Sequence, residues 1–377
     1  MSARNGPLRG LRIVEVGGIG PVPFCGLVLS DLGADVIRLD RPGGPASGSG
    51  MPDDLMRRGR RSIVLDLKKP EGVHVARSLL RSADGLLEGF RPGTMERLGI
   101  GPEVCLADNP RLVFGRMTGY GQEGPDAARA GHDINYLART GLLSSIGPAG
   151  GPPVVPLNVV GDFGGGGLLL AVGMLAGLLE AQRSGLGQVV DVAMTDGSAL
   201  LATMLFELLG RGHWTEERGA NLNDGGAPFY AVYETADARY VAVGALERPF
   251  FDSMMKGLGL DPSAVPDHND RACWPALRAQ LATAFLRRTR DDWAAVFAGV
   301  DACVSAVLTM TESLAGAVNV VPVDGHLQPA PAPRFSRTSA EHPSNSPVPG
   351  AHTDEVLRET GFSPDEIGTL RQSGAIG

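Results

Sequence analysis

Short apolar runs alternate with segments of helical period over residues 1–120. Each run is rich in branched aliphatic side chains and is bounded by glycine or charged residues, which is typical of buried parallel strands. The expected strands cover 11–16, 35–40, 62–67, 85–90 and 112–117, and the expected helices between them include 24–32 and 72–82. Strands that alternate with helices at this spacing predict a doubly wound α/β domain with a Rossmann-like sheet.

The pattern changes in the second half of the chain. Two apolar helices are expected over about 164–182 and 193–210, a hairpin over 229–234 and 239–245, and short helices over 249–258, 274–286 and 291–298. We therefore expect a large Rossmann-like domain over 1–215 and a smaller α+β domain over 225–320. The remainder, 321–377, is expected to be a proline- and serine-rich linker with a C-terminal helix that returns to the large domain.

One stretch, 164–179, carries no charged residue and lies between Asp162 and Glu180. It is shorter than the roughly 20 residues that a membrane span needs, and about a third of it is glycine. We expect a buried helix that packs closely through its small residues, and no membrane partner.

Composition narrows the function classes. With 377 residues, 43% apolar and 20% charged, the chain is typical of a globular protein, and its net charge of −8 argues against nucleic acid or an anionic membrane as a partner. The four cysteines are scattered, which makes a disulfide framework or a metal site unlikely and favours a reducing compartment. The first residues lack the apolar core of a signal peptide, so a cytoplasmic protein is the simplest expectation.

A glycine-rich turn after the first strand invites comparison with dinucleotide-binding loops. Gly18-Ile19-Gly20 is followed by Pro21-Val22-Pro23, so the third glycine of the fingerprint is missing and two amide donors are lost. Arginines are more informative, because several fall at strand ends, where guanidinium groups could bind phosphates. They are Arg38, Arg41, Arg57, Arg58, Arg60, Arg61, Arg91 and Arg97. Any single one could merely solvate the surface, but the set fits a phosphorylated ligand such as coenzyme A.

Two residues at glycine-rich junctions suit proton transfer from opposite sides of one carbon. His132 follows Gly131 at the mouth of an expected helix, and Asp162 precedes a run of four glycines. Each has a plainer alternative, since a lone histidine is usually a packed or solvated residue and Asp162 could cap the next helix. Asp133 is expected to be a helix N-cap, and the free amides of that turn could stabilise an oxyanion. The glycine run favours close approach of a ligand.

Other polar residues carry less signal. Glu247, in a turn after an expected strand, is on sequence alone a surface acid. Cys25 and Cys303 are expected to be core residues rather than nucleophiles.

Three motifs resemble the α-methylacyl-CoA racemases of the class III coenzyme A transferase superfamily. They are Gly131–Tyr136, Gly161–Gly166 and Asn223–Pro228, and the likeness runs from about residue 7 to the final helix. Segments 31–38 and 89–93 are shared across the superfamily. Transferases of this superfamily generally lack the histidine, use the aspartate at the Asp162 position to form a mixed anhydride, and tend to carry a glycine loop where this chain has 246–249. The resemblance therefore favours an acyl-CoA racemase or epimerase, with a coenzyme A transferase as the alternative.

The resemblance also implies roles for individual residues. His132 and Asp162 would move the α-proton on opposite faces of the substrate, Glu247 would orient the histidine, and the backbone amide of Asp133 would receive the enolate oxygen. Coenzyme A, as part of the substrate, would be held by Arg38, Leu65, Asp66, Leu67, Lys68, Gly89, Phe90, Arg91, Arg97, Gly131 and Tyr136. No separate cofactor or metal is implied. The class III fold forms an interlocked homodimer, in which Glu247 would come from the partner chain.

One segment departs from this pattern. The stretch 311–328 is shorter than in typical racemases and lacks their histidine-containing part. Since this stretch links the two domains, we expect its shortening to affect the shape of the substrate pocket, and a specialised acyl group becomes possible.

Overall fold

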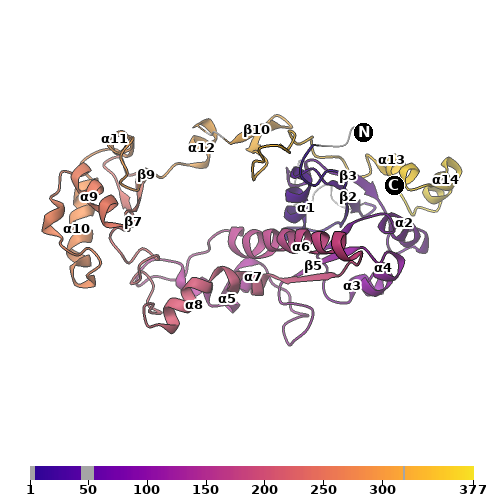
Figure 1. Ribbon diagram of the computed structural model, residues 1–377, viewed down its shortest axis with the longest axis horizontal. Helices are drawn as coiled ribbons and strands as arrows, with labels where there is room; N and C mark the ends of the chain where they lie inside the picture. Colours follow the sequence, from indigo (N-terminus) through magenta and orange to yellow (C-terminus); the bar gives the residue numbers. More distant parts are fainter. Residues whose placement is uncertain (1–4, 44–54, 317–318) are drawn as a thin grey trace. The chain divides into compact units, whose positions relative to one another are not determined.

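A six-stranded parallel sheet organises the N-terminal half of the chain (Figure 1). The computed structural model describes residues 5–43, 55–316 and 319–377. The sheet has the order β3-β2-β1-β4-β5-β6. Its strands are β1 (Arg12–Val16), β2 (Asp35–Asp40), β3 (Arg61–Val64), β4 (Gly85–Glu88), β5 (Val113–Thr118) and β6 (Val189–Ala193). The five strands expected from the sequence and the Rossmann-like arrangement are confirmed.

Strand β6 was not expected. It pairs in parallel with β5 at the edge of the sheet, and Val189 and Asp191 are exposed there. Val189, Val190 and Val192 are β-branched, but Asp191 interrupts the run and the stretch lies directly before an expected helix, so we did not assign a strand to it.

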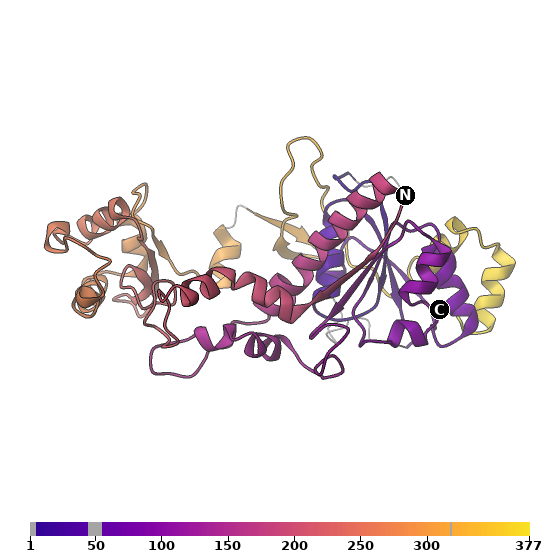
Figure 2. The same cartoon turned by 60° about the horizontal axis from the view of Figure 1, so that its bottom comes forward.

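Helices cover both faces of the sheet (Figure 2). The helices between β1 and β5 are α1 (Pro21–Asp31), η1 (Leu55–Arg57), α2 (Pro70–Leu80), α3 (Thr94–Arg97) and α4 (Pro102–Asp108). Proline occupies the first turn of α1, α2 and α4, where its missing amide costs nothing. For this reason α1 begins three residues before the apolar period that we used to place it.

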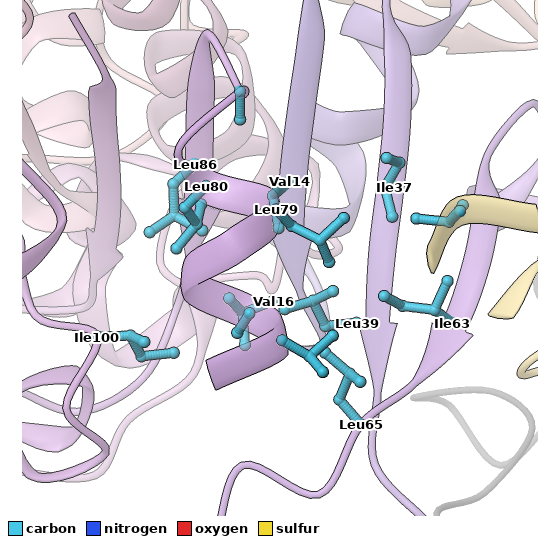
Figure 3. Close-up of a cluster of buried hydrophobic side chains, with 14 of the residues drawn as sticks. Val14, Val16, Ile37, Leu39, Ile63, Leu65, Leu79, Leu80, Leu86 and Ile100 are labelled. Atoms are coloured by element: carbon cyan, nitrogen blue, oxygen red, sulfur yellow. The ribbon is translucent and has the colours of Figure 1, made fainter. Parts of the chain in front are cut away.

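One face of the sheet packs against α2 and the C-terminal helices. Val14, Val16 and Ile37 of the strands are fully buried and meet Leu79 and Leu80 of α2 (Figure 3). The other face packs against α1 and α6 (Leu169–Ser184) through a second buried cluster. The sheet is thus covered on both sides, as a parallel sheet requires.

Helix α6 continues an unusual π-helix, η3 (Val159–Leu168). Within the described residues, Val159–Ser184 is the one helical stretch long and apolar enough to cross a membrane. In this structure α6 lies against the sheet, as expected of a helix packed through small residues. A Cβ on Gly177 would be 2.8 Å from Val113 Cγ1, and one on Gly173 would be 2.6 Å from Val190 Cγ1.

The chain divides into two units. The large unit comprises Met1–Thr140, Leu157–Ala202 and Asn319–Gly377, and the small unit comprises Gly141–Pro156 and Thr203–Val318. Compared with the expected division at 1–215, 225–320 and 321–377, the small unit also takes 141–156 and helix α8 (Thr203–Gly210). The large unit further contains α5 (Asp133–Arg139) and α7 (Met194–Leu201).

The small unit is built on a three-stranded antiparallel sheet. The hairpin of β7 (Tyr230–Glu234) and β8 (Tyr240–Gly244) is confirmed, and β9 (Val304–Ala306) adds a strand that we did not expect. Its helices are η2 (Leu142–Ser145), α9 (Arg248–Gly257), η4 (Pro262–Ala264), η5 (Arg271–Cys273), α10 (Trp274–Phe285), α11 (Arg290–Val296) and α12 (Met310–Gly316). Aromatic side chains such as Phe251 and Phe285 form its core.

The C-terminal part returns to the large unit. Within the expected linker, β10 (Val320–Val323) and β11 (His326–Pro329) form a hairpin, and α13 (Thr353–Glu359) and α14 (Pro364–Gln372) follow. This part covers the free edge of β3, where the amide of His352 donates to Ser62 O at 2.9 Å and the amide of Gly377 donates to Val64 O at 3.3 Å. In the shortened stretch 311–328, residues 317 and 318 lie outside the described residues.

Close packing of glycine against glycine yields a stability prediction. A Cβ on Gly197 of α7 would be 1.8 Å from Gly165 O of η3, whereas one on Gly368 of α14 would meet nothing within 4 Å. We expect Gly197→Ala to lower the free energy of unfolding by about 3 kcal/mol, because a backbone clash must be relieved. The matched change Gly368→Ala should raise it by about 0.5–1 kcal/mol. Urea unfolding followed by circular dichroism measures both, and equal stabilities of the two variants would contradict the packing.

Candidate active site

Two neighbouring cavities lie at the carboxyl edge of the large sheet. The first, which we call the site cavity, has a volume of about 860 Å³, and the second, the strand-end cavity, about 370 Å³. They share the walls Gly18, Ile19 and Phe90, from the loops after β1 and β4. Strands β1 and β4 are neighbours at the point where the strand order reverses, which is where open α/β sheets bind ligands.

His132 and Asp162 line the same cavity. His132 is exposed and occupies the N-cap position of α5, where its amide donates to Asn135 Oδ1 at 3.0 Å. Asp162 is half-buried in η3 and belongs to the same cavity wall as Asn158 and Phe163. The structure therefore brings together the two residues that the sequence singled out for proton transfer.

The carboxyl group of Asp162 is tuned toward its neutral form. Burial raises its pKa, and the nearby Asp133 carboxylate raises it further. A hydrogen bond from Asn158 Nδ2 at 3.4 Å and the proximity of His132 act in the opposite direction. The net pKa is raised, which brings the group closer to the range where a carboxyl can both take and give a proton.

Asp133 is not the N-cap that we expected, because His132 takes that position. The Asp133 side chain is only 3% exposed, and its Oδ1 accepts a hydrogen bond from the Asp162 amide at 2.7 Å. Its Oδ2 has no hydrogen-bond partner among the described residues. Gly161 is needed beside it, since a Cβ there would be 2.6 Å from Asp133 Oδ1. The side chain thus anchors the π-helix to α5, while the Asp133 amide belongs to the open first turn of α5.

Three glycines of the run after Asp162 pack closely against other parts of the large unit. Gly165, Gly166 and Gly167 are buried. A Cβ on Gly165 would be 2.7 Å from the Ser198 amide nitrogen, and one on Gly167 would be 2.7 Å from Pro21 O. Asp162 also does not cap a helix, because it lies inside η3. π-Helical turns are rare and often coincide with functional sites.

The residues expected to hold coenzyme A divide between the two cavities. The site cavity is lined by Gly89, Phe90, Arg91, Gly131 and Tyr136, and the strand-end cavity by Arg38, Leu65, Asp66, Leu67, Lys68 and Phe90. Arg97 lines neither cavity; it is exposed on α3 and donates to Thr94 Oγ1 at 2.9 Å. Tyr136 holds the segment before α5 in place, since its hydroxyl donates to Gly131 O at 2.5 Å.

Arg38 is held in ion pairs. It is 4% exposed, contacts Glu15 and donates to Asp40 Oδ1 at 2.9 Å and to Gly18 O at 3.2 Å. Burial lowers the pKa of Arg38, but the two carboxylates outweigh it and raise that pKa. A guanidinium so committed positions the loop after β1 more readily than it binds a phosphate. Arg41, which belongs to the arginine set named from the sequence but was not among the residues expected to hold coenzyme A, is exposed and lines the same cavity.

Most other arginines of the set are structural and buried. Their carboxylate partners are Asp40 for Arg57, Asp31 for Arg58, Glu15 for Arg60 and Asp35 for Arg61. Neither a solvated surface nor a phosphate site describes these four arginines, because each is buried and paired with a carboxylate. The sequence alone does not show these pairings.

Glu247 lies in the small unit, as the exposed N-cap residue of α9. Glu247 and His132 thus belong to different units. Of the cysteines, Cys25 is fully buried and burial raises the pKa of its thiol, as expected of a core residue. Cys303 is exposed, so its assignment to the core was wrong.

Comparison with known proteins gives the family. Residues 8–353 match CoA-transferase family III. The chain belongs to this family. It is 46% identical to the alpha-methylacyl-CoA racemase of Mus musculus, over 96% of this chain and 95% of that protein, and 43% identical to that of Homo sapiens, over 98% and 97%. A crystal structure of a CAIB/BAIF family protein from Brucella suis superposes with a TM-score of 0.82 at 26% identity, over 95% of this chain and 100% of that one. The expected class III fold is confirmed.

The contact between Asp133 and Asp162 predicts a change in titration. Replacing Asp133 by Asn keeps an oxygen that can accept from the Asp162 amide but removes a neighbouring negative charge. The pKa of Asp162 should therefore fall, because its carboxylate form is no longer repelled. Carbon-13 NMR of the Asp162 carboxyl measures this in both proteins. Asp365→Asn, on exposed α14, is the control and should leave the Asp162 titration in place; an unchanged or higher pKa in Asp133→Asn would refute the coupling.

Proposed function

We propose that this chain is an α-methylacyl-CoA racemase, which inverts the α-carbon of a 2-methylacyl-CoA or a related 2-substituted thioester. The observation that carries the proposal is His132, which shares a cavity with Asp162. A transferase of the same family needs the carboxylate, whereas inversion needs a second proton-transfer group on the other side of the carbon. The two relatives named alpha-methylacyl-CoA racemase support the same choice.

The chemistry requires removal of a weakly acidic proton next to a thioester carbonyl. In one direction His132 takes the proton from one face and Asp162 returns a proton to the other face; in the reverse direction they exchange roles. The raised pKa of Asp162 suits this exchange, because a carboxyl whose pKa lies closer to neutrality is a better proton donor and acceptor. The Asp133 amide, in the first turn of α5, would stabilise the enolate oxygen.

Coenzyme A would extend from the strand-end cavity into the site cavity. The two cavities meet at Ile19 and Phe90, so a pantetheine chain passing there would bring its thioester to His132. Arg41 and Lys68, both exposed at strand ends, would bind phosphates. Arg38 would support them by holding Gly18. The substrate brings the coenzyme, and the proposal includes no further cofactor.

The active unit in this proposal is a homodimer. Val172 of α6 and Leu200 and Leu201 of α7 are 61%, 60% and 57% exposed, so their apolar side chains are available for contact with a second copy. In the interlocked arrangement, Glu247 of a second copy would accept a hydrogen bond from His132 and fix its ring. The four cysteines are free, which is consistent with a reducing compartment such as the cytoplasm.

The two-base mechanism predicts opposite stereochemical defects. His132→Ala and Asp162→Asn should each lower racemisation by roughly 10²- to 10⁴-fold, because each removes one proton-transfer group. In deuterium oxide, each variant should still exchange the α-proton of one enantiomer only, and the two variants should retain opposite enantiomers. Proton NMR of separate enantiomers of a 2-methylacyl-CoA measures this. Absence of α-proton exchange in the wild-type protein would contradict the racemase. An acyl-enzyme trapped by hydroxylamine, together with turnover that depends on an acceptor acid, would indicate the transferase instead.

A mixing experiment tests the origin of Glu247. His132→Ala and Glu247→Gln should each be impaired alone. If Glu247 acts across the dimer, a mixed and re-equilibrated sample contains heterodimers with one intact site. The mixture should then recover about a quarter of the wild-type rate, since half of random dimers are heterodimers with one of two sites restored. Recovery no greater than the mean of the two variants would show that Glu247 acts within its own chain or not at all.

A further inference from the structure

A buried glutamate that takes no part in the proposed proton transfer directly precedes the loop that lines both cavities. Glu88 is the last residue of β4 and is 1% exposed. Its Oε2 accepts a hydrogen bond from the Phe90 amide at 2.7 Å, and its Oε1 accepts one from Arg116 Nε at 3.2 Å. The side chain thus folds back and fixes the first turn of the loop that follows its own strand.

This loop forms part of the wall between the two cavities. Gly89–Pro92 line the site cavity, and Phe90 lines the strand-end cavity as well. The loop has little freedom on its other side, since a Cβ on Gly89 would be 2.9 Å from Val22 Cγ2 of α1. The Glu88 carboxylate is therefore the polar contact that sets where Phe90 stands.

Arg116 holds the carboxylate in turn. Arg116 on β5 is the register partner of Glu88, and its Nη2 donates to Glu96 Oε1 of α3 at 3.1 Å. On the next strand, β6, its register partner is Asp191. A buried carboxylate between a cation and a backbone amide is a strong and specific arrangement, because both partners donate to the ionised form.

We propose that Glu88 is a positioning residue for acyl-CoA binding, which fixes Phe90 at the junction where the coenzyme passes from one cavity to the other. This inference rests on the proposed function. Glu88 touches neither of the proton-transfer groups, so its influence falls on how well the coenzyme is held and not on the proton transfer itself.

The charge of this group gives the site a dependence on pH. Burial raises the pKa of Glu88 to about 7, against the lowering effect of the Phe90 amide and Arg116, and Glu96 adds a small rise. Above that pH the carboxylate accepts from both donors. Below it the protonated group loses its charge-assisted bond to Arg116, so the anchor of Phe90 weakens. Coenzyme A should accordingly bind more tightly on the alkaline side of about pH 7.

The test compares two substitutions on the same arginine, with free coenzyme A as the probe. Glu88→Gln keeps the shape of the side chain but removes its charge, and should raise the Kd roughly three- to tenfold above pH 7. Its kcat should stay near the wild-type value while its KM rises. Glu96→Gln also removes a carboxylate from Arg116 but leaves the Phe90 amide paired, and should bind as the wild type does. Isothermal calorimetry over a pH series measures all three proteins.

The outcomes separate cleanly. Titration of the coenzyme's own phosphates is common to all three proteins, so the prediction is that wild-type affinity converges on that of Glu88→Gln as the pH falls. Equal affinities at every pH, or the same loss in Glu96→Gln, would overturn the proposal. Should Glu88→Gln not fold, the wild-type protein still tests it: bound coenzyme A must lower the pKa of Glu88 in difference infrared spectra, and an unchanged pKa would overturn it. The α-proton exchange assay tests racemisation independently of this comparison.

Discussion

The carboxyl edge of the large sheet depends on one buried carboxylate. Glu15 is fully buried on β1 and pairs with both Arg38 and Arg60. Two cations on one carboxylate offset the cost of its desolvation, and they join β1 to β2 and to the segment before β3. Gly26 of α1 leaves the room for them, since a Cβ there would be 2.1 Å from Glu15 Oε2. The loop after β1, which lines both cavities, begins directly after this cluster.

The same principle recurs at the proton-transfer site with the charge left partly uncompensated. Asp133 is buried beside Asp162, and one of its oxygens has no partner among the described residues. A cation in that position would have stabilised the fold and lowered the pKa of Asp162. The chain instead places two carboxyl groups together, and the negative charge of Asp133 raises the pKa of Asp162. Glu15 and Asp133 thus differ in whether an arginine accompanies the buried carboxylate.

Much of the fold follows from local pattern, and part of the site does too. The β-branched runs of β1, β2 and β3 were recognised, whereas β6, which contains three valines, was missed because it lies between two expected apolar helices. His132 and Asp162 were found because glycine and charge stand out at a loop. Arg38 and Arg41 are only three residues apart, and no sequence pattern tells that the first points into a buried cluster and the second lines a cavity. The contact of Asp133 with Asp162 joins residues 29 positions apart, and Glu247 belongs to another unit.

The cover on strand β3 has a consequence for the order in which the chain folds. The free edge of this strand is paired by His352 and Gly377, although β3 itself ends at Val64. Until those late residues have been synthesised, the nascent sheet presents an open row of amides and carbonyls to other chains. The small unit is assembled from residues 141–156 and 203–318, so all of its segments leave the ribosome earlier. The first-made half of this protein is therefore the last to be completed, and its open edge is exposed to pairing with other chains for most of its synthesis.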